Sequence, residues 1–507
     1  MGRWFAKVNS IVTNARELRC WHNHGRTSSK DQMARSPVSS FTRGSVLVAD
    51  QATAQEFDIL VLGGGSGGYA TALRAVQLGF TVGLVEKAKL GGTCLHNGCI
   101  PTKALLHSAE LADHARDSAK YGVNVTLDSI DMSAVNAYKD GIIAGKFKGL
   151  QGLIKSKGIT VIEGEGKLQG NNTVVVNGTA YTGKNIVLAT GSYSRSLPGL
   201  EIGGKVITSD QALTMDYIPK SAIVLGGGVI GVEFASVWKS FGVDVTIIEG
   251  LPSLVPNEDA SIVKNLERAF KKRGIKFTTG IFFQGVEQND DGVKVTLVDG
   301  QTFEADLLLV AVGRGPVTAN LGYEEAGITI DRGFVITNER LHTGVGNIYA
   351  VGDIVPGVQL AHRGYQQGIF VAEEIAGLNP AIVEDINIPK VTYCEPEIAT
   401  VGYTEKAAKE KFGDDQVQTQ EYNLAGNGKS SILGTGGIVK LVRQKDGPVV
   451  GIHMIGSRMG EQIGEAQLIV NWEAYPEDVA QLVHAHPTQN EALGEAHLAL
   501  AGKPLHG

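Results

Sequence analysis

The sequence predicts an α/β fold that holds two Rossmann-like dinucleotide-binding units, and two observations support this prediction. A buried-strand pattern at residues 57–62 runs directly into a glycine-rich turn, and the same arrangement recurs from residue 221. After each turn come a stretch of helical periodicity and a second apolar run that ends in an acidic residue. The chain has 507 residues, more than one hydrophobic core usually serves, so further domains are expected beside these units.

The first unit begins with FDILVL, a pattern typical of a buried strand, and continues through GGGSGG into the helical stretch YATALRAVQLGF. Gly63, Gly65 and Gly68 have the spacing G-x-G-x-x-G, which seats a pyrophosphate at a helix N-terminus. The next predicted strand, TVGLVE, ends in Glu86, 23 residues beyond Gly63, where a carboxylate can bind a ribose. We therefore predict a dinucleotide site in this unit.

The second unit repeats this order within SAIVLGGGVIGVEFASVWKSFGVDVTIIEG. Gly226, Gly228 and Gly231 follow its first strand, and Glu249 ends its second strand at the same distance of 23 residues from the first glycine. Two dinucleotides on one chain indicate a flavin and a nicotinamide that exchange hydride. The carboxylate of Glu249 would accept bonds from a free ribose 2′-hydroxyl and repel a 2′-phosphate, so NAD is favoured over NADP.

The composition argues against several classes of function. A formal net charge of −7 argues against nucleic-acid and anionic-membrane partners, which require a basic surface. Apolar runs such as AIVLGGGVIGVEF are interrupted before they reach the roughly 20 residues of a membrane span. Four cysteines in this length do not form the scaffold of a secreted protein, so a reducing compartment is expected, namely a bacterial-type cytoplasm.

Residues 1–52 differ from the rest of the chain, because basic residues, Ser and Thr are common and acids are few. This composition is typical of a mitochondrial-type presequence, which would place the mature protein in the mitochondrial matrix. The alternatives are a disordered tail or an over-called start codon, with the true chain beginning near Met33 or later. A secretory signal is not expected, since a clear apolar core is missing from the segment.

Two of the four cysteines, Cys94 and Cys99, lie five positions apart in the stretch GGTCLHNGCIPTK. In a regular helix their Cα atoms would be about 8.7 Å apart, beyond the reach of a disulfide. Gly98 and the turn-prone Asn97 allow a tighter, irregular turn before a helix predicted to start at Pro101, so a disulfide is geometrically possible. Two unrelated core thiols are equally compatible with the spacing alone.

Other properties of this segment narrow the chemistry. A structural zinc site needs four ligands, and Cys20 and Cys394 form no second pair, so no metal is predicted. Cys99 lies directly before the predicted helix start, where the helix dipole and free N–H groups lower the pKa of a thiol. We therefore expect Cys99 to form a thiolate readily.

With these cysteines directly after the first unit, the chain resembles the FAD-dependent pyridine nucleotide-disulfide oxidoreductases of class I, from about residue 55 to its C-terminus. Further motifs that carry the resemblance are ATGS at 189–192, AVGRGP at 311–316, NIYAVGDI at 347–354, LAHRG at 360–364 and HAHPTQNEA at 484–492. The resemblance implies four segments: an FAD-binding domain at 53–198, an NAD-binding domain at 199–321, a central segment completing the FAD site at 322–388, and an α+β dimerisation domain at 389–507.

The resemblance also implies roles for individual residues. Cys94 and Cys99 would form a redox-active disulfide against the flavin, with Cys94 exchanging with substrate and Cys99 passing electrons to the ring. Lys103 and Glu233 would form a charge pair near the reduced flavin, and Asp353 would hold its ribityl chain. The other cofactor contacts that the resemblance implies are Gly92, Thr93, Lys103, Thr190, Gly191, Ser192, Gly313 and Ala361.

Oxidation of a dithiol requires a base, because a disulfide is attacked by a thiolate and not by a thiol. Histidine titrates near neutral pH, and His486 precedes Glu491 by five residues, which provides a carboxylate to orient the ring. The neighbouring His484 lacks an acid at that spacing. The resemblance implies that His486 reaches the disulfide of the other subunit, so that the active unit is a homodimer.

The activity that the resemblance implies is oxidation of dihydrolipoamide by NAD, with lipoyl domains of 2-oxo-acid dehydrogenase acyltransferase subunits as partners. Two alternatives remain open: a related NAD(P)H-dependent reductase of another small disulfide, such as that of glutathione, and a mainly structural subunit of a dehydrogenase assembly. Departures from the commonest family pattern, none of which removes a reactive group, are His96, Asn97, Thr102, Arg363, Gln489 and Asn490.

Overall fold

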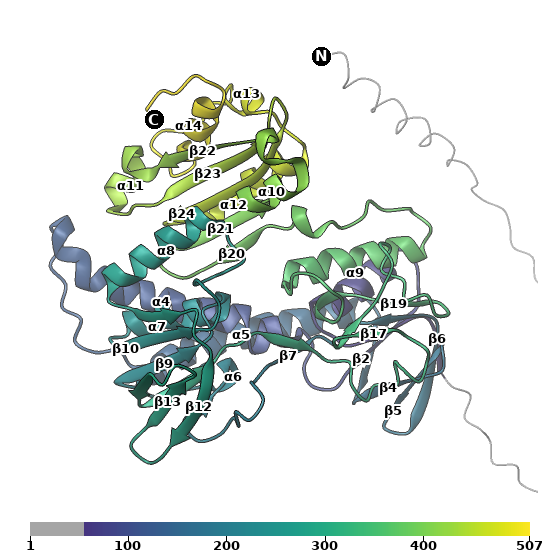
Figure 1. The fold of residues 1–507 in the computed structure, drawn as a ribbon. Coiled ribbons are helices and arrows are strands. Elements are labelled where there is room, and N and C mark those ends of the chain that lie inside the picture. Colours follow the sequence, from purple (N-terminus) through teal and green to yellow (C-terminus); the bar gives the residue numbers. More distant parts are fainter. Residues whose placement is uncertain (1–54, 507) are drawn as a thin grey trace, which may run out of the picture. The chain divides into compact units, whose positions relative to one another are not determined.

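Figure 1 shows the computed structural model, which describes residues 55–506 of the chain. The expectations for residues 1–52, with Cys20 among them, fall outside the described residues. Between residues 55 and 506, no helix is long and apolar enough to cross a membrane. Two large sheets with parallel central strands are followed by an antiparallel sheet in the C-terminal part, which confirms the predicted α/β class.

The first large sheet is centred on the strand that precedes the first glycine-rich turn. Its order is β3-β2-β1-β6-β5-β4, with β19 also pairing with β6. The pairs among the first four strands are parallel, as is the pair with β19, whereas β4 and β5 are antiparallel additions. The strands are β1 (Gln55–Leu62), β2 (Val82–Glu86), β3 (Thr160–Glu163), β4 (Gly166–Gln169), β5 (Thr173–Val176), β6 (Thr179–Leu188) and β19 (Ile348–Ala350).

The second large sheet repeats this plan, and all its neighbouring strands are parallel, in the order β11-β10-β9-β15-β8. A smaller antiparallel sheet, β12-β13-β14, is inserted before its last strand. The strands are β8 (Val206–Ile207), β9 (Ser221–Leu225), β10 (Asp244–Glu249), β11 (Lys276–Thr279), β12 (Phe283–Gln288), β13 (Val293–Leu297), β14 (Thr302–Ala305) and β15 (Leu307–Val310). The two βαβ units that the sequence predicts are therefore present.

The central strands are buried on both faces, as the uninterrupted apolar runs predict. Ile59, Leu60 and Val61 of β1 have no exposed surface, because helices cover parallel sheets from both sides. On one side, α2 and α9 lie in close contact: a Cβ on Gly368 of α9 would lie 2.3 Å from the carbonyl oxygen of Gly67 in α2. The helices of this part are α2 (Ser66–Gln77), α5 (Met132–Ser156), α6 (Ser209–Ala212), α7 (Val229–Ser240), α8 (Ala260–Arg273) and α9 (Ala361–Ile375).

The cysteine segment forms two consecutive helices, α3 (Gly92–His96) and α4 (Cys99–Asp117). The predicted start of the second helix at Pro101 is wrong by two residues, since Gly98 is its N-cap and Cys99 its first residue. Proline is tolerated at the third position because the N–H groups of a first helical turn have no partner within the helix. Cys99 thus lies in the first turn itself.

The C-terminal sheet is antiparallel throughout, in the order β20-β21-β24-β23-β22. Its core is closed by α12 and α14, whose Ala466 and Leu493 pack in one cluster with Leu441 and Met454 of the sheet. The elements are β20 (Lys390–Thr392), β21 (Glu397–Gly402), α10 (Glu405–Phe412), β22 (Val417–Asn423), α11 (Gly428–Leu433), β23 (Ile438–Gln444), β24 (Val449–Gly456), α12 (Met459–Asn471), α13 (Pro476–Val479) and α14 (Glu491–Leu500).

Short elements connect these parts. The strand β7 (Ser192–Ser194) pairs with β16 (Arg314–Pro316), so the chain enters and leaves the second nucleotide-binding unit through one small ladder. A second small ladder joins β17 (Ile330–Asp331) to β18 (Phe334–Val335). Single 3₁₀ turns are η1 (Ser118–Tyr121), η2 (Gly352–Ile354), η3 (Asp385–Asn387), η4 (Asp414–Gln416) and η5 (Leu424–Gly426).

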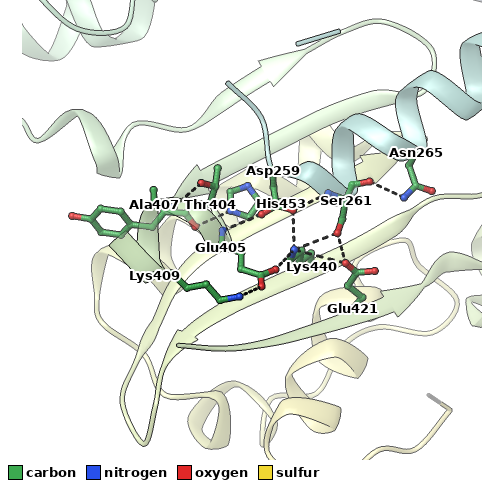
Figure 2. A network of polar contacts seen from close by, with 11 residues as sticks. Asp259, Ser261, Asn265, Thr404, Glu405, Ala407, Lys409, Glu421, Lys440 and His453 are labelled. Atoms are coloured by element: carbon green, nitrogen blue, oxygen red, sulfur yellow. Dashed lines mark hydrogen bonds and ion pairs between the residues drawn. The ribbon is translucent and has the colours of Figure 1, made fainter. Parts of the chain in front are cut away.

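A buried ion network joins α8 of the second unit to the C-terminal sheet (Figure 2). Lys440 of β23 has 4% of its side chain exposed and donates to Asp259 at 2.9 Å and to Glu405 at 2.7 Å. Asp259 is also the N-cap of α8, and its other oxygen accepts the N–H of Glu405 at 3.0 Å. One lysine therefore connects a helix start and two elements of the C-terminal part.

Candidate active site

Both glycine-rich turns and the cysteine pair line one cavity of about 1720 Å³. The predicted site residues that line it are Gly63, Gly65, Glu86, Gly92, Thr93, Cys94, Cys99, Lys103, Thr190, Gly191, Ser192, Gly226, Gly228, Glu233, Glu249, Gly313, Asp353 and Ala361. The predicted residues outside its lining are Gly68, Gly231, His486 and Glu491. One continuous space thus connects the two nucleotide sites through the thiols.

The first glycine-rich turn fits a pyrophosphate. Gly63 has φ +110°, and a Cβ there would lie 2.2 Å from the carbonyl oxygen of Ala189. A Cβ on Gly68 would lie 1.8 Å from the carbonyl oxygen of Gly63, so the third glycine lets α2 pack against the turn. Gly65, the N-cap of α2, lines the cavity and supplies no side-chain cap, which leaves N–H groups of the first helical turn free for an anion.

The second turn has the same construction. Gly226 also has φ +110°, and a Cβ on Gly231 would lie 1.9 Å from its carbonyl oxygen. Gly228 is the uncapped N-cap of α7, and a Cβ there would meet nothing within 4 Å. The open position faces the cavity, so this turn fits a second pyrophosphate.

The acids that end the second strands are held by their own turns. Glu86 accepts hydrogen bonds from Gly64 N at 2.7 Å and from Ala88 N at 2.8 Å. Glu249 binds the second turn in the same manner, accepting at 2.6 and 2.8 Å from the two equivalent N–H groups. Each carboxylate has lone pairs left to accept hydrogen bonds from ribose hydroxyls, and neither has a hydrogen to donate to a phosphate.

The two cysteines meet across the turn at Gly98, and their thiols are free and close to one another. A hydrogen bond from the Cys94 thiol and the charge of Lys103 lower the pKa of Cys99 to about 7, although burial opposes this. The same hydrogen bond, together with burial, raises the pKa of Cys94. The reduced pair therefore keeps its thiolate at Cys99 and its proton at Cys94.

Lys103 and Glu233 form the predicted charge pair, with the Lys103 amino group 2.8 and 2.9 Å from the two carboxylate oxygens. Glu233 has 3% of its surface exposed and also accepts the N–H of Tyr393 at 2.9 Å. The Tyr393 ring lies under the Lys103 amino group, 4.8 Å from nitrogen to centroid. Burial alone would lower the pKa of Lys103, but Glu233 raises it above its ordinary value.

Asp353 and the residues after β6 form another side of the cavity. The Ser192 hydroxyl donates to Asp353 Oδ2 at 2.5 Å, and the Thr190 hydroxyl donates to the carbonyl of Val317 at 2.6 Å. Arg363, one of the departures from the family pattern, is buried and donates to the carbonyl of Gly352, next to Asp353, at 3.3 Å. Arg363 therefore holds the backbone next to Asp353 from outside the lining of the cavity.

The predicted base and its partner lie in contact at the surface. His486 Nδ1 is 2.8 Å from Glu491 Oε1, and 77% of the His486 side chain is exposed. Burial raises the pKa of Glu491, but hydrogen bonds from Thr488 N and from the His486 ring outweigh burial and lower it. His484 has no acid five residues on, as stated from the sequence, but its Nε2 lies 2.9 Å from Glu465 of α12, a partner too distant in the chain for that spacing to reveal.

Two family profiles match the chain. That of the pyridine nucleotide-disulphide oxidoreductases covers residues 57–368, and that of the dimerisation domain of the same proteins covers residues 388–497. The chain belongs to the pyridine nucleotide-disulphide oxidoreductase family. In this family, the cofactors of the dihydrolipoyl dehydrogenases are FAD and NAD, and the two turns described above fit both.

Relatives in this family are similar over nearly their whole length. Dihydrolipoyl dehydrogenase of Bacillus subtilis (strain 168) is 40% identical over 474 residues, covering 89% of this chain and 100% of the relative. The mitochondrial dihydrolipoyl dehydrogenase of Pisum sativum is 39% identical over 472 residues, covering 89% and 93%. The crystal structure of LpdA from Mycobacterium tuberculosis matches with a TM-score of 0.81 at 26% identity, covering 88% of this chain and 100% of that one.

Sequence reasoning missed two residues that contact this oxidoreductase site. Arg314 lines the cavity and donates to Ser192, while Tyr393 contacts both members of the Lys103–Glu233 pair. Arg314 lies in the motif AVGRGP, directly after the predicted cofactor contact Gly313, and this position could have indicated that its charge belongs to the site. Tyr393 had no such signal, since its place depends on the pairing of β20 with the C-terminal sheet.

Proposed function

We propose that this chain oxidises dihydrolipoamide to lipoamide and reduces NAD to NADH, with FAD as its bound cofactor. The observation that carries this proposal is the pair Cys94 and Cys99, which lies beside Lys103 in a cavity shared by two dinucleotide turns. The proposal is also supported by the relatives reported in the preceding subsection, which are named dihydrolipoyl dehydrogenases. We propose as well that the chain divides into functional segments at 53–198, 199–321, 322–388 and 389–507.

The chemistry begins with proton removal, for which His486 of the partner subunit is the proposed base. The substrate thiolate attacks Cys94 Sγ, the bond between Cys94 and Cys99 breaks, and Cys99 leaves as a thiolate. The low pKa of Cys99 suits this step, because the better leaving group is the thiol of lower pKa. The second substrate thiol gives up its proton and attacks the substrate sulfur that is bonded to Cys94. That bond breaks, Cys94 leaves and takes up a proton, and lipoamide is released with its own disulfide.

The remaining steps return the protein to its oxidised form. Bound FAD, which Gly63, Gly65 and Asp353 would hold, would supply the acceptor for the electron pair of the cysteines and the hydride for NAD. The overall reaction releases one proton per turnover. Lys103 contributes a positive charge beside Cys99, and Glu233 keeps that charge in place. Asp353 and Ser192 are proposed to hold the cofactor, and Glu249 to bind the ribose of NAD.

The homodimer is supported by the dimerisation domain and by the position of the base. His486 is mostly exposed and lies outside the cavity that contains the cysteines, so within one chain it has no access to them. A second subunit that presents His486 to the cavity mouth would complete the site. We further propose lipoyl domains of acyltransferase subunits as partners, and a bacterial-type cytoplasm or mitochondrial matrix as the compartment.

The test is an assay of the purified protein for a bound yellow flavin and for dihydrolipoamide-dependent reduction of NAD. We expect turnover with NAD to exceed turnover with NADP, because Glu249 repels a 2′-phosphate. Preference for glutathione disulfide with NADPH would contradict the proposal in favour of a different small-disulfide reductase. A flavin-free protein without turnover would indicate a structural subunit.

A further inference from the structure

Arg314 lies at the crossing point between the two nucleotide-binding units. It begins β16, the strand by which the chain leaves the second unit, and it pairs with Ser194 of β7, the strand by which the chain enters that unit. Its side chain is half-buried and lines the cavity. None of the roles proposed above uses this guanidinium.

The guanidinium binds three residues of the site. Its Nε donates to Ser192 Oγ at 2.8 Å, and its Nη2 donates to the Ser192 carbonyl at 2.7 Å. Weaker contacts reach Ser194 Oγ at 3.3 Å and Thr93 Oγ1 at 3.5 Å. Thr93 precedes Cys94, so Arg314 also touches the helix that carries the exchanging thiol.

The direction of these bonds follows from donor counting. A guanidinium can only donate, so Ser192 Oγ must accept from Arg314. The single hydroxyl proton of Ser192 is then free for Asp353, whose Oδ2 lies 2.5 Å away. Arg314, Ser192 and Asp353 form a chain of hydrogen bonds that all point in one direction. The arginine fixes the orientation of the Ser192 hydroxyl, and the hydroxyl in turn fixes the orientation of the Asp353 carboxylate.

We propose that Arg314 is a positioning residue of the FAD site, which acts through Ser192 to orient the Asp353 carboxylate. This inference rests on the proposed function, because Asp353 is there assigned to the cofactor. The second bond, to the Ser192 carbonyl, holds the backbone from which the hydroxyl projects, so both parts of Ser192 depend on one side chain. Loss of Arg314 should therefore weaken FAD binding more than it changes the use of substrate.

The first experiment measures the dissociation constant of FAD from deflavinated protein by fluorescence quenching. We expect Arg314→Met to raise it about tenfold or more, which is the effect of losing one charge-assisted hydrogen bond. Arg314→Lys should be intermediate, since an ammonium can bind the hydroxyl or the carbonyl but lacks the planar fork. Arg332→Met is the matched control, because Arg332 is 88% exposed and its polar contact among the described residues is with Asp331 at 3.4 Å.

A double-mutant cycle separates the relay from a general structural role. If Arg314 acts through Ser192, Arg314→Met should cost clearly less in FAD affinity in a Ser192→Ala background than in the wild type. An equal cost in both backgrounds would overturn the relay. Should Arg314→Met fail to fold, the same cycle is run with Arg314→Lys.

The results also distinguish this inference from the proposed function. If the wild-type chain binds FAD but Arg314→Met binds it as tightly as Arg332→Met does, only the role of Arg314 is wrong. If the wild-type chain binds no FAD, the proposed function and the relay are both wrong. The KM for dihydrolipoamide of flavin-saturated Arg314→Met should stay within about twofold of the wild-type value, and a large rise would contradict a role at the cofactor.

Discussion

Cys94 and Cys99 are chemically equivalent in isolation and become different through their neighbours. Cys99 accepts a hydrogen bond from the Cys94 thiol and lies near the Lys103 amino group, so its pKa falls to about 7. Cys94 donates that bond and is buried, so its pKa rises. The asymmetry fits the proposed roles, in which Cys99 is the leaving thiolate and Cys94 the sulfur that substrate attacks.

Removal of the nearby cation should move the titration of Cys99. We expect Lys103→Met to shift the midpoint for alkylation of Cys99 in the reduced protein from about 7 to higher pH, because the lost charge stabilised the thiolate. The measurement is the rate of iodoacetamide labelling at Cys99 against pH, with the labelled site assigned by tandem mass spectrometry so that the other thiols do not contribute. Lys276→Met, on an exposed lysine paired with Asp244, should leave the midpoint unchanged.

The base and its orienting acid predict a loss of rate without a loss of fold. His486→Gln should lower turnover of dihydrolipoamide by about 10²- to 10⁴-fold, the usual share of a general base. The chain offers a matched control in His506, which contacts Glu495 at 2.9 Å and is 65% exposed, much as His486 contacts Glu491. His506→Gln should retain wild-type turnover, and equal losses in both variants would remove His486 from the mechanism.

At the scale of elements, the second and third glycines of each glycine-rich turn have different functions: one leaves space for a ligand, and the other lets a helix pack against the turn. A Cβ at Gly231 would lie 1.9 Å from a carbonyl oxygen, whereas a Cβ at Gly228 would enter the open cavity. The third glycine of the fingerprint therefore allows α7 to pack on β9, and the second leaves the space that the proposed dinucleotide would occupy.

These two glycines predict opposite phenotypes for the same added methyl group. Gly231→Ala should lower the thermal midpoint markedly or prevent folding, because the clash is with backbone. Gly228→Ala should keep the wild-type midpoint without nucleotide and raise the dissociation constant of NADH, because only the ligand loses room. Calorimetry of both variants, with and without NADH, checks this, and the reverse order of effects would contradict it.

Sequence patterns predicted the parts of the structure whose residues lie close together in the chain. The buried strands, the glycine spacing and the terminal acids all lie within about 30 residues, the length of a βαβ unit. The start of α4 was missed by two residues because Pro101 suits both the first and the third helical position. His484–Glu465, Arg314–Ser192 and Lys440–Asp259 were missed because each pair joins elements far apart in the chain.

At the scale of the whole molecule, the ion network of Lys440 ties a nucleotide-binding unit to the C-terminal sheet (Figure 2). Lys440 and Asp259 have 4% and 2% of their side chains exposed, so neither charge has water as a substitute partner. The attraction of Lys440 and the N–H groups of Glu405 and Ser261 outweigh burial and hold the pKa of Asp259 below its ordinary value. The network therefore depends on its one buried cation.

Loss of that cation should destabilise the protein. We expect Lys440→Met to lower the free energy of unfolding by about 3–5 kcal/mol, because Asp259 is left as an uncompensated buried charge. Lys409→Met is the control, since Lys409 is 38% exposed and among the described residues is paired with Glu405, at the carboxylate oxygen that Lys440 does not bind. Urea denaturation of both variants measures the difference, and equal stabilities would show that the network adds nothing.

The central claim is that cysteines of one subunit and His486 of the other form one site, and mixed dimers test it most directly. Cys94→Ser and His486→Gln homodimers should each be nearly inactive in dihydrolipoamide-dependent reduction of NAD. After the two are denatured and refolded together, about a quarter of wild-type turnover should return, because half of randomly paired dimers are mixed and each regains one of two sites. No recovery in refolded mixtures that contain mixed dimers, or full activity of the Cys94→Ser parent, would contradict the account.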